Sequence, residues 1–241
     1  MRLAWVHARA DTLELFRYPS FSVPTLLLPA AGFLLFGLGA SEGSDAAAMA
    51  SFAAIALLSV SFFQFGVGIA AERISPWQVY LRTLPASPYA RFGARVMSAL
   101  AFGTAAVIPI VVLSLIATDV RLGAEHWLLL TATLLLGSVP FCLAGVALGY
   151  WLTPRGAIPI ANLLFLALTL AGGLFLAGRT APDEIQRVTG LPTSLWGELV
   201  VAAVDEAPWR PWNVAGLGAY AVVFGILALW GYRRDEGEKF R

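Results

Sequence analysis

Long apolar stretches separated by short polar connections dominate the chain. A transmembrane helix needs about 20 mostly apolar residues. Six stretches meet that length, at roughly residues 23–40, 47–71, 93–117, 126–151, 157–177 and 213–231. We therefore predict an all-α integral membrane protein with six transmembrane helices, formed by residues 1–241 as a single domain.

The residues before the first apolar stretch show a helical period instead of a continuous apolar run. On a helix, Asp11 and Glu14 share a polar face, aromatic and aliphatic residues cluster on the opposite face, and Arg17 lies at the flank. This pattern predicts an N-terminal interfacial amphipathic helix that lies among the lipid headgroups. The alternative is a soluble lead-in segment whose periodicity arises by chance.

A polar segment, "AERISPWQVYLRTLPASPYARFGAR", separates the second and third apolar stretches. Ser75 can cap a helix that begins at Pro76, and Pro85 ends it. At 1.5 Å per residue this helix is near 13 Å long, so it is too short to span a membrane. Its apolar residues follow the i, i+3, i+4, i+7 spacing of one continuous stripe. They are Trp77, Tyr80, Leu81 and Leu84.

The apolar stripe of residues 76–84 has two possible uses. Burying each of its side chains is worth about 1.5 to 3 kcal/mol, which is enough to dock a short helix into a groove of another protein. The alternative is an interfacial helix held by lipid. The sequence pattern leaves both open, and it favours docking.

Basic residues are distributed unevenly between the connections. With six spans both termini lie on one side, and that side holds twelve of the sixteen Lys and Arg residues. The opposite side collects nine of the fifteen carboxylates. The positive-inside rule therefore predicts that both termini and residues 71–95 are cytoplasmic, in a multi-pass protein of the cell (inner) membrane.

The predicted spans contain very few groups that could couple to ions. Carboxylates, histidines and basic residues at membrane depth are costly and usually mark function. We find none in the interior of the predicted spans, since Arg95 and His126 fall at span ends. The larger polar residues there are Gln64 and Asn162. Each is a candidate for the substrate path, although hydrogen bonding between helices is the simpler explanation. The spacing of Gly145 and Gly149 permits close helix contact.

Composition and motifs argue against several other classes of protein. Hydrophobic residues make up 59% of the chain and charged residues 13%, with a net charge of +1, so no basic patch for nucleic acid is expected. His7 and His126 fall on opposite sides of the predicted membrane, so they cannot share a metal. The single lysine, Lys239, has no glycine-rich loop before it, so no phosphate-binding P-loop is present. No catalytic constellation stands out.

The connection before the last apolar stretch is long and rich in tryptophan. Trp196, Trp209 and Trp212 are of the residue type that settles at membrane surfaces. Because irregular backbone is not tolerated in lipid, the segment "SLWGELVVAAV" is predicted to form a short re-entrant or interfacial helix. It is either a gate over the exit, with Trp196 on the substrate path, or a structural lid.

The order of these elements resembles the type 2 ABC exporter permeases. The most specific part is "RTLPASPYARFGARVMSAL", which is similar to the Leu-Pro after that family's coupling helix and to the basic entry into its third span. The long outer connection is a second similar part, and the resemblance covers nearly the whole chain. One departure is Ser75-Pro76, where family members often have glycine.

The resemblance implies that residues 76–84 are the coupling helix, which sits in a cleft of a separate ATPase. Glu72 and Arg73 would flank it, and Asp11, Glu14 and Arg17 would be polar partners in a second contact. The chain itself would bind no cofactor, because ATP and Mg would be held by the ATPase. Two ATPase copies are implied, together with a second permease copy or a related partner.

The leading hypothesis is thus the permease subunit of an ATP-driven exporter that moves an apolar or amphipathic substrate, such as a drug, lipid or glycolipid. A secondary transporter or channel, and a membrane scaffold that transports nothing, are the alternatives. The absence of ionisable groups from the predicted spans argues against ion coupling. By itself the chain is not expected to be an enzyme.

Overall fold

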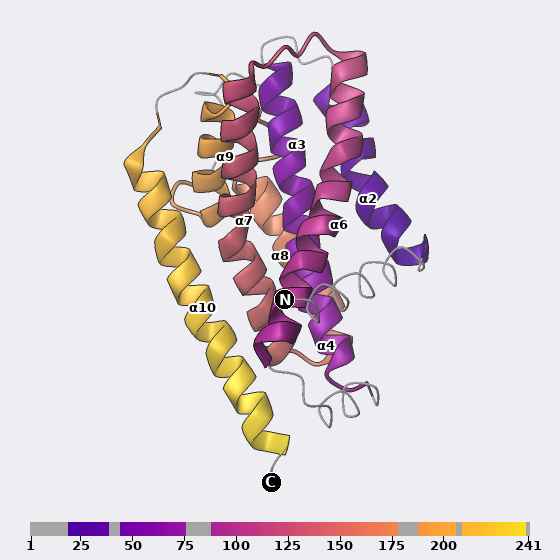
Figure 1. Cartoon of the computed structure of the whole chain (residues 1–241), viewed down its shortest axis with the longest axis vertical. Coiled ribbons are helices and arrows are strands. Elements are labelled where there is room, and N and C mark those ends of the chain that lie inside the picture. The colour runs from indigo at the N-terminus through magenta and orange to yellow at the C-terminus, as the bar shows by residue number, and fades with distance from the viewer. Residues whose placement is uncertain (1–18, 39–43, 76–87, 178–187, 206–208, 240–241) are drawn as a thin grey trace.

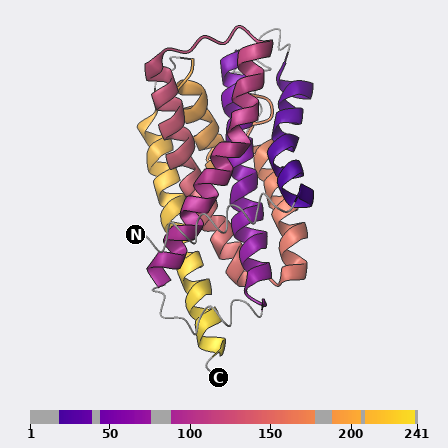
Figure 2. The ribbon, with the colours of Figure 1, turned by 45° about the vertical axis from the view of Figure 1, so that its right-hand side comes forward.

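The described part of the chain is a bundle of helices that run along the long axis of the molecule (Figures 1 and 2). In the computed structural model, the described residues are 19–38, 44–75, 88–177, 188–205 and 209–239. The helices, in chain order, are α2 (Pro19–Gly32), the π-helix η1 (Phe33–Gly37), α3 (Asp45–Val60), the π-helix η2 (Ser61–Val67), α4 (Gly68–Glu72), α6 (Pro88–Ala117), α7 (Ala124–Trp151), α8 (Pro154–Ala171), α9 (Pro192–Ala202) and α10 (Pro211–Lys239).

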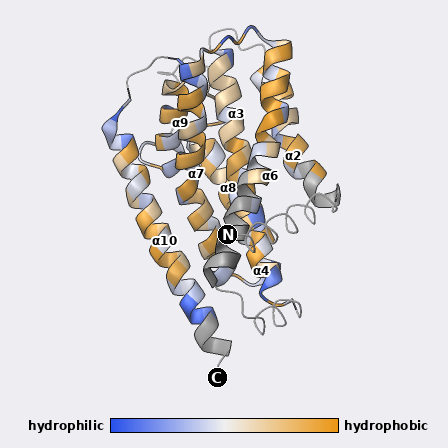
Figure 3. Cartoon of the chain, in the orientation of Figure 1, coloured by the Kyte–Doolittle hydropathy of each residue, from blue (hydrophilic) through white to orange (hydrophobic). Residues whose placement is uncertain are grey.

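Helices overlap all six predicted spans, but they differ in length and hydropathy. Four are long and apolar enough to cross a membrane, namely Asp45–Glu72, Ala124–Trp151, Pro154–Ala171 and Pro211–Asp235. The apolar parts of the other two, Thr25–Gly37 and Ala101–Ala117, are shorter. Hydrophobic residues cover the middle of the helices and hydrophilic ones gather at their ends (Figure 3). A helical, multi-pass membrane protein is thus confirmed, and the count of six spans stays a prediction.

The helix pair α3–η2 forms the centre of the bundle. About nine tenths (89%) of its most apolar window is buried, compared with 17% for α8 and for α10. Its sequence is rich in alanine, and small side chains let neighbouring backbones approach closely. The helix begins at Ser44, whose side chain accepts a hydrogen bond from the Ala47 backbone N–H at 3.2 Å. α3–η2 is therefore the core, whereas α8 and α10 present most of their surface outward.

Glycines on α7 allow it to pack directly against η2. A Cβ atom at Gly145 would overlap the carbonyl oxygen of Ser61, and one at Gly149 would lie 2.6 Å from the Ile69 Cβ. The predicted role of Gly145 and Gly149 in close helix contact is thus confirmed. The π-helical geometry of η2 was not predicted, since no sequence signal used above distinguishes a π-helix from an α-helix.

The predicted short helix in the outer connection is present as α9. It lies among the other helices, packed against α3, α7 and α10. It starts beside α8, where the Thr193 hydroxyl donates to the Leu168 carbonyl at 2.8 Å. It ends near the start of α3, where Ser44 donates to Asp205 at 2.7 Å. α9 is therefore a buried part of the bundle, and whether it re-enters the membrane stays a prediction.

One helix is shorter than its predicted span and another is longer. The fifth apolar stretch was expected to continue to residue 177, but α8 ends at Ala171. The chain turns there because Gly173 adopts a φ of 75°, a conformation that favours glycine and commonly ends helices. The last helix extends beyond its predicted span, 213–231, and continues to Lys239. Polar residues can continue a helix beyond the apolar stretch that predicts it.

We predict that Gly145→Val destabilises the protein by about 1–3 kcal/mol or more, because the added side chain meets backbone that cannot rotate away. The matched control is Gly218→Val on α10, where an added Cβ meets no atom within 4 Å. Thermal unfolding in detergent measures both variants. Equal unfolding temperatures for the two would contradict the close η2–α7 contact.

Candidate functional site

Arg73 lies directly after α4 and ahead of the predicted coupling helix. It is the C-cap residue of α4, and its backbone N–H donates to the Ile69 carbonyl. The next turn is held by a hydrogen bond of 2.9 Å from the Ser75 N–H to the Glu72 carbonyl. Arg73 is thus part of an ordered connection that leads from the bundle to residue 76.

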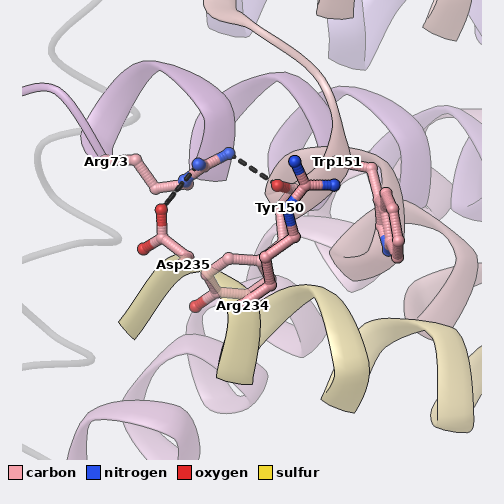
Figure 4. Close-up of a pocket in the computed structure, with 5 residues that line it drawn as sticks. All are labelled: Arg73, Tyr150, Trp151, Arg234 and Asp235. Atoms are coloured by element: carbon pink, nitrogen blue, oxygen red, sulfur yellow. Dashed lines mark hydrogen bonds and ion pairs between the residues drawn. The ribbon is translucent and has the colours of Figure 1, made fainter. Parts of the chain in front are cut away.

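The Arg73 guanidinium joins three helices (Figure 4). It forms an ion pair of 2.6 Å with the Asp235 carboxylate of α10, and its Nε donates to the same oxygen at 2.8 Å. Its Nη1 donates to the carbonyls of Gly149 at 3.0 Å and Tyr150 at 2.8 Å, and weakly to that of Leu152 at 3.4 Å. One side chain of α4 therefore holds the ends of α7 and α10.

The chemistry of arginine explains this arrangement. The last carbonyls of a helix have no partner within the helix and carry a partial negative charge, so a cation binds there favourably. Guanidinium offers five donors in a fixed plane, which allows it to serve carbonyls and a carboxylate together. The Asp235 side chain is only 6% exposed. Removing one member of a buried ion pair typically costs about 3–5 kcal/mol.

Aromatic residues surround the ion pair. Tyr150 packs edge-on against Tyr232 with ring centres 5.5 Å apart, and Trp151 packs likewise against Trp230 at 4.7 Å. The Trp151 indole donates to the Leu227 carbonyl at 3.0 Å. Such aromatic girdles form at membrane–water interfaces. They fasten the end of α7 to α10 beside the ion pair.

A small polar pocket of about 100 Å³ opens within this cluster. The Arg234 guanidinium lies over the Trp151 ring at 5.5 Å, and that of Arg73 lies 5.7 Å from the centre of the Tyr150 ring. Both contacts have the geometry of cation–π interactions. We define the Arg73 cluster as the residues that line the pocket, which are Arg73, Tyr150, Trp151, Arg234 and Asp235.

The two polar candidates for the substrate path lie in different environments. Gln64 is half-buried on η2, and its Nε2 lies 3.4 Å from the Ser98 hydroxyl of α6, whereas its Oε1 is buried without a hydrogen-bond partner among the described residues. Asn162 is exposed on α8 and donates to the Ile158 carbonyl of its own helix at 3.1 Å. The structure does not bring the two residues together, and their contact with a substrate stays a prediction.

Trp196 is a packing residue in this conformation. Its side chain has no exposed surface, and its indole N–H donates to the Thr133 carbonyl of α7 at 3.0 Å. Its ring packs against Phe141 with centres 5.1 Å apart, and Gly137 leaves room for it because a Cβ there would overlap the indole. In this conformation Trp196 presents no surface to a substrate, and its place on the substrate path stays a prediction.

Several predicted docking residues fall outside the described residues. The coupling-helix residues Trp77, Tyr80, Leu81 and Leu84 are among them, as are Asp11, Glu14 and Arg17 of the predicted interfacial helix. Of the two flanking residues, Glu72 is half-buried at the end of α4 and Arg73 has the contacts given above. Their role in docking an ATPase therefore stays a prediction.

Sequence reasoning missed the partners of Arg73. Asp235 stood out only as a carboxylate after Arg233 and Arg234, with nothing to relate it to residue 73. The aromatic pairs "YW" at 150–151 and "WGY" at 230–232 were a usable signal. Both lie at the ends of apolar stretches on the predicted cytoplasmic side, and Trp and Tyr are enriched at membrane–water interfaces.

Comparisons with known proteins relate the chain to a family. A family model described as ABC-2 type transporter matches residues 3–188. A protein of Bacillus subtilis (strain 168), named "Putative transport permease YvfS", is 23% identical over 238 residues, which cover 94% of this chain and 96% of the relative. The family model matches most of the chain, so the chain belongs to the ABC-2 type transporter family.

Proposed function

We propose that this chain is the permease subunit of an ATP-driven exporter, powered by a separate ATPase subunit. The observation that carries the proposal is the family match over residues 3–188, since permeases of this family typically work with an ATPase subunit. Similarity to the named relative over nearly the full length of both chains supports the same role.

The ATPase would dock on residues 76–84. In the chain, residues 76–84 come after α4 and before α6. α4 and the start of α6 lie at the same end of the bundle as the C-terminal part of α10 (Figure 1). The Arg73 cluster fixes α4 to α7 and α10 at this end. A force applied by the ATPase to residues 76–84 would therefore act on an anchored part of the permease.

The proposed substrate is apolar or amphipathic, such as a drug, lipid or glycolipid. Among the described residues, the buried polar groups are serines, threonines, Asn213 and Asp235, so a single carboxylate is buried and it is paired with Arg73. A path lined in this way offers few charges to a polar or ionic solute.

The proposed assembly contains two ATPases and two permease subunits, either identical or related, in the inner membrane. The surfaces of α8 and α10 that point outward are available to lipid or to the second permease. Both termini and the Arg73 cluster would be cytoplasmic, because most basic residues fall on that side. α9 would then lie toward the outer side, where the substrate leaves.

The docking assignment predicts that the Trp77→Glu, Leu81→Glu double variant loses its ATPase. Two carboxylates in an apolar groove would have to be desolvated, which costs several kcal/mol. The measurement is co-purification of an untagged P-loop ATPase with the tagged permease. Trp209→Glu, at an exposed position before α10, is the matched control and should retain the ATPase. Retention by the double variant would refute the docking assignment.

The substrate class predicts which compounds stimulate ATP hydrolysis. With the complete complex in nanodiscs, amphipathic drugs and lipids should raise the ATPase rate, whereas small inorganic ions should not. The comparison is the ATPase rate of the complex with and without each compound. Ion-gradient-driven uphill transport by the purified chain alone would overturn the proposal in favour of a secondary transporter.

A further inference from the structure

We propose that α10 is a rod that carries movement from the Arg73 cluster to α9. The inference rests on the proposed function, because it says how the movement of a docked ATPase reaches the outer side of the permease. It assigns positioning roles to Asp235 at one end of α10 and Asn213 at the other. Neither residue needs to touch the substrate or the ATPase.

The inner end of α10 is fixed to the coupling junction. Asp235 binds Arg73, which lies between α4 and the predicted coupling helix. The same guanidinium binds the Gly149 and Tyr150 carbonyls at the end of α7. Displacement of the chain after Ser75 would therefore pull on α10 and α7 together.

The outer end of α10 is fixed to α9. The Asn213 side chain is buried and donates to the Glu198 carboxylate at 2.9 Å. Tyr220, further along α10, donates through its hydroxyl to the Gly190 carbonyl just before α9, also at 2.9 Å. Two hydrogen bonds from one helix thus hold the start and the middle of the α9 segment.

The distance between the two attachments matches a membrane. Asn213 and Asp235 lie on one uninterrupted helix, which has no proline after its first residue. At 1.5 Å per residue they are about 33 Å apart, and the hydrocarbon core of a bilayer is about 30 Å thick. The polar attachments therefore fall on opposite sides of the apolar layer, as a rod that crosses the membrane requires.

α10 is packed against protein on one side and presents its other side outward. It packs chiefly against α7 and α9, and only 17% of its most apolar window is buried. The apolar side chains on the outward face of α10 have no hydrogen bond to lose, and on its α7 face the hydrogen bond from Trp151 to the Leu227 carbonyl is one that a movement along α7 would break. α9, in contrast, is buried and covers Trp196, so its displacement from α7 would open the centre of the bundle.

The test follows the distance between α9 and α7 in the complete permease–ATPase complex in nanodiscs. Spin labels are placed at exposed Thr189, before α9, and exposed Asp119, before α7, in a Cys142→Ser background. The probe is ATP with vanadate, which traps the ATPases and needs no known substrate. In the unmodified chain, trapping should shift the distribution of distances between the labels.

Removing the side-chain contact at either end of α10 should reduce the shift in the distance between the labels. Asp235→Asn and Asn213→Leu should each retain the ATPase but reduce the ratio of shifted to unshifted population by roughly fivefold or more, the lower end of typical coupling between sites. The variant with both changes should respond no worse than either single variant, because the two residues act in one path. Asp235→Glu should restore the response.

The matched control is Arg233→Gln, a charge change at an exposed position of the same helix, which should respond as the unmodified chain does. A full response in Asp235→Asn, or release of the ATPase by that variant, would overturn the inference while leaving the proposed function intact. An unmodified chain that binds no ATPase would refute the proposed function, and the inference with it. If Asp235→Asn fails to fold, Arg73→Lys replaces it, because it keeps the charge but lacks the planar fork.

Discussion

Close packing between η2 and α7 determines where the other helices can lie. Lipid tails are as apolar as the helices, so helices associate in a membrane through close van der Waals contact and hydrogen bonds more than through the hydrophobic effect. Gly145 and Gly149 provide that contact by allowing backbone to meet backbone. α7 in turn supports α9 and α10. The placement of the outer helices therefore follows from two residues that lack a side chain.

Buried polar groups follow a second constraint, which explains why the Arg73 cluster lies at one end of the bundle. A buried charge needs a partner and further hydrogen bonds to offset its desolvation. At the end of α7, unpaired carbonyls provide those hydrogen bonds to Arg73, and Asp235 provides the opposite charge. In mid-helix each carbonyl already accepts a backbone hydrogen bond, so it offers less to a cation than the unpaired carbonyls at a helix end do. A site of this kind therefore forms where a helix ends.

Under the proposed function, the two constraints give different roles to the core helices and to the more exposed helices. The core of α3, η2 and α7 is packed too closely to change shape at low cost. α8 and α10 are the long apolar helices with the most exposed surface. Under the proposed function, a movement of the ATPase that reaches Arg73 would therefore displace α10 more readily than the core. At its other end α10 is hydrogen-bonded to α9. The Trp196 indole, buried between α9 and α7, is the contact that such a movement would break.

The sequence alone determined the helical class, the approximate place of the apolar helices and the close contact at Gly145, because span length and small-residue spacing are local properties. Tertiary structure decided the rest. Arg73 and Asp235 are 162 residues apart, and no local pattern relates them. They meet only because α7 packs against both η2 and α10. Trp196 likewise suggested a membrane surface by its type, but it is buried because Gly137 on another helix leaves space for its ring. Pairings of this kind depend on which helices are neighbours, which is fixed by packing over the whole bundle.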